Sequence, residues 1–173
     1  MLPDYFEFSL PTRVIYGIGA IDQSSEAVAP WGQRRALLVT DAVLVQAGLA
    51  ERVKAGFRKT AVEIVCVYDQ VPPNSTIRTV EDCAALGREH GCDLIVGLGG
   101  GSVLDTAKVA NILMVKGGRV QEHMGAYLLG QTKLLPLVLI PTTAGTGSEA
   151  TKVAVIADPE HDVKLPFAET QFL

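Results

Sequence analysis

The sequence predicts an α/β domain with a doubly wound, mostly parallel sheet. Short apolar runs of strand length alternate along the chain with helical periods of about a dozen residues. Several of these runs are uninterrupted, which is typical of strands that are covered by helices on both faces. We therefore expect right-handed strand–helix–strand crossovers and a single domain over residues 1–173.

The predicted elements follow one another in a regular order. Apolar or alternating runs predict strands at 12–16, 36–39, 62–68, 94–98, 134–140 and 153–157. Apolar residues at helical spacing predict helices at 21–28, 43–57, 76–90 and 103–115, and a weaker helical stretch at 120–123. Gly91 follows the third of these helices as a typical left-handed stop.

The composition favours a small-molecule ligand. The chain has 173 residues, of which 48% are hydrophobic, and a formal net charge of −4, so disorder is excluded. Without a run of Lys and Arg, we expect no binding to nucleic acid or anionic membranes. The sequence has no apolar run of the roughly 18 residues that span a membrane and no secretory pattern at its start, which predicts a cytoplasmic protein.

The cysteines and histidines give weak signals. Cys66, Cys83 and Cys92 are odd in number and lack CxxC spacing, so we expect reduced thiols without a disulfide or metal role. The acidic turn at 158–162 contains His161, but adjacent residues in a proline turn lack the spacing that brings ligands to one ion. We predict no metal ligand in the chain.

The carboxyl ends of the predicted strands are the places where a ligand binds in such a sheet. Polar or glycine-rich residues follow four of these ends, at Asp41, Asn74, 99–102 and 142–149. The run Gly99, Gly100 and Gly101 is the strongest signal, because it follows a buried strand and opens a helix. Backbone N–H groups at a helix start and residues without Cβ suit the close approach of a phosphate.

The same segment has a purely structural interpretation. Ser102 and Asp105 form an S-x-x-D pattern, in which each side chain would cap the other residue's N–H at the helix start. A cap needs one glycine at most, so three in a row favour phosphate binding. The run differs from the usual dinucleotide fingerprint, which belongs to the first strand–helix turn, and the Walker A lysine is absent.

Two further segments keep alternative interpretations. Asp41 could accept both ribose hydroxyls of NAD and repel a 2′-phosphate, or it could cap the following helix. The hydroxyl-rich segment 142–151 suits a pyrophosphate or a nicotinamide carboxamide, but it could also be a polar turn before a helix.

Taken together, these motifs resemble the N-terminal half of an iron-type (group III) alcohol dehydrogenase. The matching segments are Pro11–Ala20, Thr40-Asp41, Pro73-Asn74, Gly99–Lys108 and Pro141–Thr151. The resemblance implies a Rossmann-like α/β domain of the dehydroquinate synthase type. It also implies an NAD(P)-dependent oxidoreductase that interconverts alcohols and aldehydes or ketones by hydride transfer, with NAD preferred over NADP.

The resemblance further implies roles for individual residues. The glycine loop with Ser102 would hold the pyrophosphate, Asp41 would meet the adenosine ribose, and Asn74 would lie near the cofactor. The nicotinamide side of the cleft would be lined by Thr142, Thr143, Thr146 and Thr151. Asp105, in the glycine-loop motif, and Lys164 complete the predicted cofactor-binding residues.

The chain differs from the family's pattern at the metal ligands. In the family, Fe²⁺ or Zn²⁺ is held by one aspartate and three histidines of a following helical domain, and none of His90, His123 or His161 matches these positions. We expect residues 1–173 to contain neither this helical domain nor the catalytic residues. We also expect the chain alone to bind the cofactor without turning over alcohol. The alternatives are a glycerol dehydrogenase, a dehydroquinate synthase-type relative, or a non-catalytic nucleotide-binding module; a homodimer is plausible.

Overall fold

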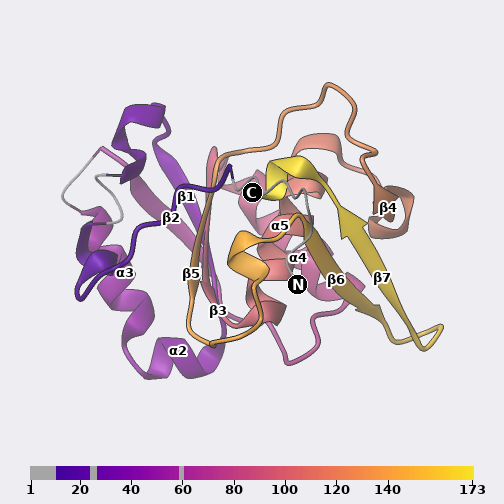
Figure 1. Cartoon of the computed structure of the whole chain (residues 1–173), viewed down its shortest axis with the longest axis horizontal. Helices are drawn as coiled ribbons and strands as arrows, with labels where there is room; N and C mark the ends of the chain where they lie inside the picture. The colour runs from indigo at the N-terminus through magenta and orange to yellow at the C-terminus, as the bar shows by residue number, and fades with distance from the viewer. Residues whose placement is uncertain (1–10, 24–26, 59–60) are drawn as a thin grey trace, which may run out of the picture.

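A four-stranded parallel sheet organises the chain. The computed structural model describes residues 11–23, 27–58 and 61–173. The strands are β1 (Arg35–Val39), β2 (Glu63–Tyr68), β3 (Leu94–Gly99) and β5 (Leu137–Pro141), in the order β2-β1-β3-β5 (Figure 1). Each neighbouring pair is parallel.

Helices cover both faces of this sheet. They are α2 (Ala42–Gln46), α3 (Leu49–Phe57), α4 (Ile77–Glu89) and α5 (Gly101–Lys116). Alternate residues of β1 enter two different cores: Leu37 packs in the cluster with α4 and α5, whereas Leu38 packs in the cluster with α3. The predicted doubly wound α/β fold is therefore confirmed.

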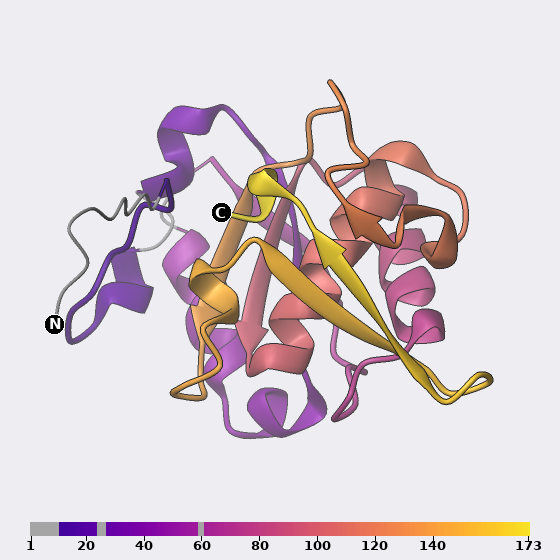
Figure 2. The ribbon, with the colours of Figure 1, turned by 45° about the vertical axis from the view of Figure 1, so that its right-hand side comes forward.

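A small second sheet packs beside α5 (Figure 2). It contains β4 (Gly125–Ala126), β6 (Val153–Asp158) and β7 (Val163–Ala168), in the order β4-β7-β6. The β6 and β7 strands form an antiparallel hairpin. Ala154, Ile156 and Phe167 of this hairpin are buried in the same core as α5.

The predicted elements differ from the structure in three places. The predicted strand 12–16 is irregular, because no strand of the described part pairs with it. Most of its side chains are exposed, with Val14 66% and Tyr16 98% accessible. The predicted helix 43–57 is two helices, because Gly48 adopts a left-handed conformation with φ 78° between them. The predicted helix 21–28 is a 3₁₀ turn at Ala20–Gln23, and residues 24–26 lie outside the described residues.

The remaining predicted elements agree closely with the structure. The predicted helix 76–90 is α4, where the Thr76 side chain caps the Thr79 N–H and Gly91 follows with φ 57°. The predicted strand 134–140 begins later, at Leu137. Within the described ranges, no helix has the length and hydropathy needed to cross a membrane.

Candidate functional site

Three loops meet at the carboxyl end of the sheet. The Thr142 N–H after β5 donates to the Gly99 carbonyl at 3.0 Å. The Asn74 N–H after β2 donates to the Ser102 hydroxyl at 3.1 Å. These bonds join the start of α5 to the loops on either side of it, along the lower edge of the sheet in Figure 1.

A polar pocket of about 210 Å³ lies where these loops meet the hairpin. It is lined by Asn74, Ser75, Gly101, Ser102, Asp105, Val155, Ala157 and Lys164. Five of these eight are residues that the sequence singled out, and they come from three separate segments of the chain. The structure thus brings the start of α5, the Asn74 loop and the Lys164 strand together.

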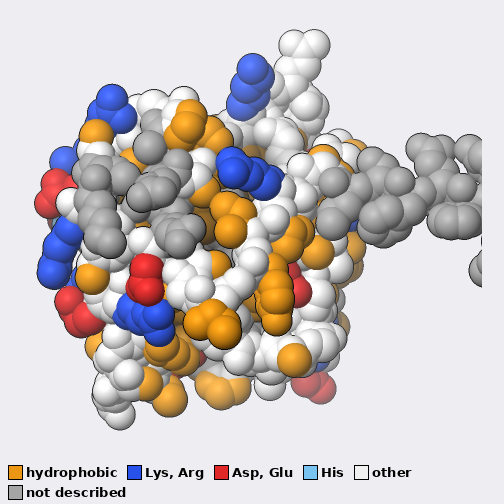
Figure 3. Space-filling view, turned by 60° about the vertical axis from the view of Figure 1, so that its left-hand side comes forward, with side chains coloured by type: hydrophobic (Ala, Val, Ile, Leu, Met, Phe, Trp, Pro, Cys, Tyr) orange, Lys and Arg blue, Asp and Glu red, His pale blue; other side chains and the backbone are white. Residues whose placement is uncertain are grey.

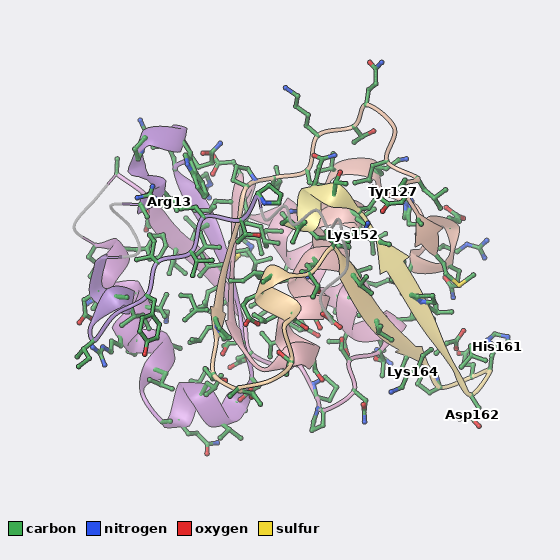
Figure 4. All side chains as sticks on the ribbon, viewed as in Figure 1. Arg13, Tyr127, Lys152, His161, Asp162 and Lys164 are labelled. Carbon is green, nitrogen blue, oxygen red and sulfur yellow. The ribbon has the colours of Figure 1, made fainter. Side chains whose placement is uncertain are left out.

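The hairpin delivers Lys164 to this pocket. Lys164 on β7 pairs with Ala157 on β6, and the Ala157 N–H donates to the Ser75 carbonyl at 2.8 Å. Figure 4 shows Lys164 on the strand, whereas His161 and Asp162 lie toward the tip of the hairpin. A lysine far along the sequence therefore supplies the positive charge of the pocket.

The three glycines of the loop have different reasons for lacking a side chain. A Cβ on Gly99 would lie 2.6 Å from Val103, and one on Gly100 would lie 2.9 Å from the Thr143 hydroxyl. These two glycines are required by packing within the protein. A Cβ on Gly101 would make only ordinary contacts, at 3.4 Å from Ser148, and this glycine lines the pocket.

The Asn74 backbone takes an unusual conformation at the pocket. Its φ of 57° lies in the left-handed region, which asparagine tolerates better than most residues. This conformation accompanies the bond from the Asn74 N–H to Ser102, and Ser75 next to it is buried and accepts a hydrogen bond from Thr106 at 2.6 Å.

The predicted capping box of α5 is wrong. The helix begins at Gly101 with Gly100 as its N-cap, and no side chain caps it. Asp105 instead accepts hydrogen bonds from the Ser148 hydroxyl at 3.0 Å and from the Val155 N–H at 2.9 Å. Burial raises the pKa of the Asp105 carboxyl, and these two donors and Lys108 oppose that change.

Lys108 lies one helical turn further along α5 and is 0% exposed. Its ammonium donates to the Thr151 carbonyl at 2.7 Å and the Val153 carbonyl at 3.1 Å, and it lies 5.5 Å from the centre of the Phe172 ring. Burial lowers the pKa of Lys108 to about 8, although Asp105 and Glu149 favour the charged form. Asp105 and Lys108 together hold segment 148–155 against α5.

Asp41 and the threonines lie outside the lining of this pocket. The Asp41 carboxylate caps α2 by accepting from the Leu44 N–H at 3.0 Å, as its structural interpretation predicts. Thr143 and Thr146 lie beside Gly100 and Gly101, and Thr142 follows β5. The Thr151 hydroxyl donates to the Val153 carbonyl at 3.3 Å.

Some residues of the site carry no signal in the sequence. Ser75, Val155 and Ala157 line the pocket because of how the Asn74 loop and β6 pack, which no local pattern shows. Lys108 is different, because a lysine on the apolar face of a predicted helix is a visible anomaly.

No metal site is present in the described ranges 11–23, 27–58 and 61–173, since they contain no group of three or more His, Cys, Asp or Glu side chains placed to hold an ion. His161 instead pairs with Asp158 at 2.8 Å.

A larger, mainly apolar cavity of about 640 Å³ lies along β5 and residues from 11–21 and 27–31. Leu135, Leu137, Leu139 and Trp31 are among its lining residues. Hydrophobic side chains are spread over the face of the molecule in Figure 3. This cavity lacks the glycine loop and the lysine of the polar pocket.

Comparison with known sequences decides the family. The pattern of the family described as "Iron-containing alcohol dehydrogenase" matches residues 11–173, which is nearly the whole chain. The chain belongs to the iron-containing alcohol dehydrogenase family. Its resemblance to that family is therefore confirmed, and the glycine-loop and threonine segments lie within the matched region.

Several named proteins are similar in sequence to this chain. A choline dehydrogenase of Bacillus subtilis is 38% identical over 162 residues, which are 92% of this chain and 40% of the relative. An NAD-dependent methanol dehydrogenase of Bacillus methanolicus is 35% identical over 159 residues, 92% of this chain and 41% of the relative. The chain thus spans about 40% of the length of these relatives.

Solved structures of the family share the fold. A 1,3-propanediol oxidoreductase superposes with a TM-score of 0.90 at 32% identity, over 98% of this chain and 44% of that one. A sulfoacetaldehyde reductase from Bifidobacterium kashiwanohense, solved in complex with NAD⁺, superposes with a TM-score of 0.85 at 26% identity. The superposition covers 99% of this chain and 45% of the reductase chain.

The Asp105 carboxylate should matter for stability. We predict that Asp105→Ala lowers the free energy of unfolding by about 2 kcal/mol, because the Ser148 hydroxyl and the Val155 N–H lose their acceptor. Urea denaturation measures the change. Asp82→Ala, which removes an exposed ion pair with Arg78, is the control and should change stability by less than about 0.5 kcal/mol. Equal effects of the two variants would show that the two bonds to Asp105 do not stabilise the fold.

Lys108 should make stability depend on pH in the alkaline range. Its pKa is about 8 in the folded protein and near 10.5 in the unfolded chain. Between these values the unfolded chain binds more protons, so the contribution of Lys108 to the free energy of unfolding rises with pH; below pH 8 it is constant. We compare the free energy of unfolding of the wild type with that of Lys108→Met. We predict that the wild-type value rises relative to the variant by on the order of 1 kcal/mol from pH 8 to 9.5. Urea denaturation across this range measures it, and a constant difference would refute the assignment.

Proposed function

We propose that this chain forms the NAD-binding part of an alcohol dehydrogenase that interconverts alcohols with aldehydes or ketones by hydride transfer. The polar pocket at the start of α5 carries the proposal, because it combines an open helix N-terminus, a glycine that packing does not require and a lysine. The NAD-dependent methanol dehydrogenase and the reductase in complex with NAD⁺ support NAD as the cofactor.

The pocket suits a pyrophosphate. With Gly100 as N-cap, the Gly101 and Ser102 N–H groups have no acceptor within the helix and point out of its first turn. The helix dipole adds a partial positive charge there, typically worth about 0.3–1 kcal/mol, and the Lys164 ammonium adds a full one. We infer that these groups bind the phosphate oxygens, while Asn74 fixes the Ser102 side chain.

The order of the strands suggests which end of NAD lies on each side of the glycine loop. Strand β3, which leads into the glycine loop, has β1 on one side and β5 on the other. Val39 pairs with Gly97, so Asp41 follows β1 at about the level where Gly99 ends β3. We infer that the adenosine ribose lies at Asp41, on the β1 side.

The nicotinamide would then lie on the β5 side. Thr142 and Thr143 follow β5 directly, and Thr146 lies beside Gly101. Their hydroxyls could bond the nicotinamide carboxamide, and the Asp105 and Lys108 contacts fix the segment that ends at Thr151. When bound, NAD accepts hydride from an alcohol or, as NADH, gives it to a carbonyl.

The metal-assisted part of the family's reaction needs other residues. The side chains of the described ranges do not provide a metal site. The function proposed for these residues is to bind and orient the cofactor. The alcohol is left open, because the relatives are named for substrates as different as choline and methanol.

Gly101→Ala tests the pocket directly. The added methyl group makes only ordinary contacts with Ser148 and Thr146, but it occupies the lining where phosphate would approach the backbone. We predict at least a tenfold loss of NAD affinity by calorimetric titration, with an unchanged melting temperature. Gly17→Ala, at an exposed glycine with nothing within 4 Å, is the matched control and should change neither quantity. Unchanged affinity in the Gly101 variant would overturn the proposed site.

Asp41→Gly tests the ribose assignment. Glycine is tolerated as an N-cap at a cost of a few tenths of a kcal/mol, so α2 should persist while the carboxylate is lost. We predict that the ratio of NADP to NAD affinity rises about tenfold, because the charge that repels a 2′-phosphate is removed. Asp41→Asn, which keeps a capping oxygen, should raise the ratio in the same direction. If neither variant changes the ratio, Asp41 acts as a helix cap only.

A further inference from the structure

The three cysteines, far apart in sequence, belong to one hydrophobic cluster. Cys66 lies on β2, Cys83 on α4, and Cys92 on the connection from α4 to β3. Cys83 is fully buried, Cys92 is 9% exposed, and Cys66 is partly exposed. The sequence indicated only unpaired thiols, because the spacing of the three residues says nothing about this juxtaposition.

Two of these thiols are in direct contact. The Sγ atoms of Cys66 and Cys92 lie 3.5 Å apart and share a hydrogen bond. A disulfide requires the sulfur atoms to come about 1.5 Å closer than this contact. Strand β1 lies between β2 and β3 in the sheet, so the two sulfurs meet across one strand.

We propose that Cys66 and Cys92 are a modification site, an intrachain dithiol that a peroxide or a small-molecule disulfide oxidises reversibly to a disulfide. With a peroxide, the first thiol is oxidised to a sulfenic acid as the O–O bond breaks and one water leaves. The second sulfur then attacks, the S–S bond forms and a second water leaves. Two thiol hydrogens and two electrons are thereby transferred to the peroxide. With a small-molecule disulfide, the first sulfur forms a mixed disulfide and releases one thiol, and the second sulfur then displaces the other thiol as the intrachain S–S bond forms. An added thiol reductant reverses either change.

The surroundings of Cys92 favour it as the first thiol, the one that reacts with the oxidant. The hydrogen bond between the two thiols lowers the pKa of Cys92, and the Arg35 guanidinium also lowers it, whereas burial and Asp93 oppose this change. Arg35 is held in place by the bond from its Nε to the His90 carbonyl at 2.9 Å. Cys83 has no such partner in the described structure, and its burial raises the pKa of its thiol, so it should stay reduced.

The position of the pair determines what its oxidation would change. Cys92 precedes β3, whereas the glycine loop follows β3, so the disulfide would form away from the proposed NAD site. It would tie the edge strand β2 to the segment before β3 and close a loop of about 25 residues, which reduces the entropy of the unfolded chain. We therefore expect oxidation to raise the melting temperature, an effect that does not depend on the proposed function. If the chain binds NAD as proposed, oxidation should leave the NAD affinity unchanged.

Peptide mapping of the oxidised full chain tests the proposal. Trypsin places each cysteine on a separate peptide, 60–78, 79–88 and 89–108. After treatment with hydrogen peroxide or oxidised glutathione, we expect a linked pair of 60–78 and 89–108, with 79–88 still carrying a free thiol. The link should disappear on reduction with dithiothreitol. A link that includes 79–88, links only between two chains, or no link at all would overturn the proposal.

Single variants supply the matched comparison. Cys66→Ser and Cys92→Ser should each abolish the link and the oxidant-dependent rise in melting temperature, whereas Cys83→Ala should retain both. The wild-type peptide map decides the question even where a variant does not fold. A rise in melting temperature that persists in Cys66→Ser would show that another modification causes it and would refute the assignment.

Discussion

The attachment of α5 to the segment that follows β5 is the interaction on which the site depends. Asp105 and Lys108, one turn apart on α5, bind the Ser148 hydroxyl and the Val155 N–H on one side and the Thr151 and Val153 carbonyls on the other. Lys108 is fully buried and Asp105 is partly buried, and a charge withdrawn from water is stable only when hydrogen-bonded. The polar segment therefore has one favourable position, beside the glycine loop.

The parallel sheet supplies the second constraint, which is direction. Because all four strands run the same way, their carboxyl ends meet at one edge. The central position of β3 places the glycine loop between Asp41 and the threonine segment. A ligand with a phosphate in its middle and different groups at its two ends fits this order, which is why a dinucleotide is proposed. The hairpin closes the pocket from the side with Lys164.

Several elements were predictable because they depend on neighbours in sequence. The β1 and β3 strands are continuous apolar runs, and α4 has both its Thr76 cap and its Gly91 stop in the local sequence. Two of the errors arose where long-range contacts decide. Residues 12–16 alternate like a strand but lack a pairing partner in the described structure, and the Ser102–Asp105 pattern is not a cap because Ser148 and Val155 compete for the carboxylate. The Cys66–Cys92 contact has no local signal at all.

The sequence by itself determined the α/β class, the position of the glycine loop and the family, because strand periodicity and glycine–helix motifs are local features. The tertiary structure decided which glycine faces the pocket, since Gly99 and Gly100 accommodate Val103 and Thr143 whereas Gly101 is free to face a ligand. It also decided the partners of Asp105 and Lys108 and the approach of Lys164 to Asn74. These contacts join residues tens of positions apart, and only the packing of helices and hairpin against the sheet brings them within bonding distance.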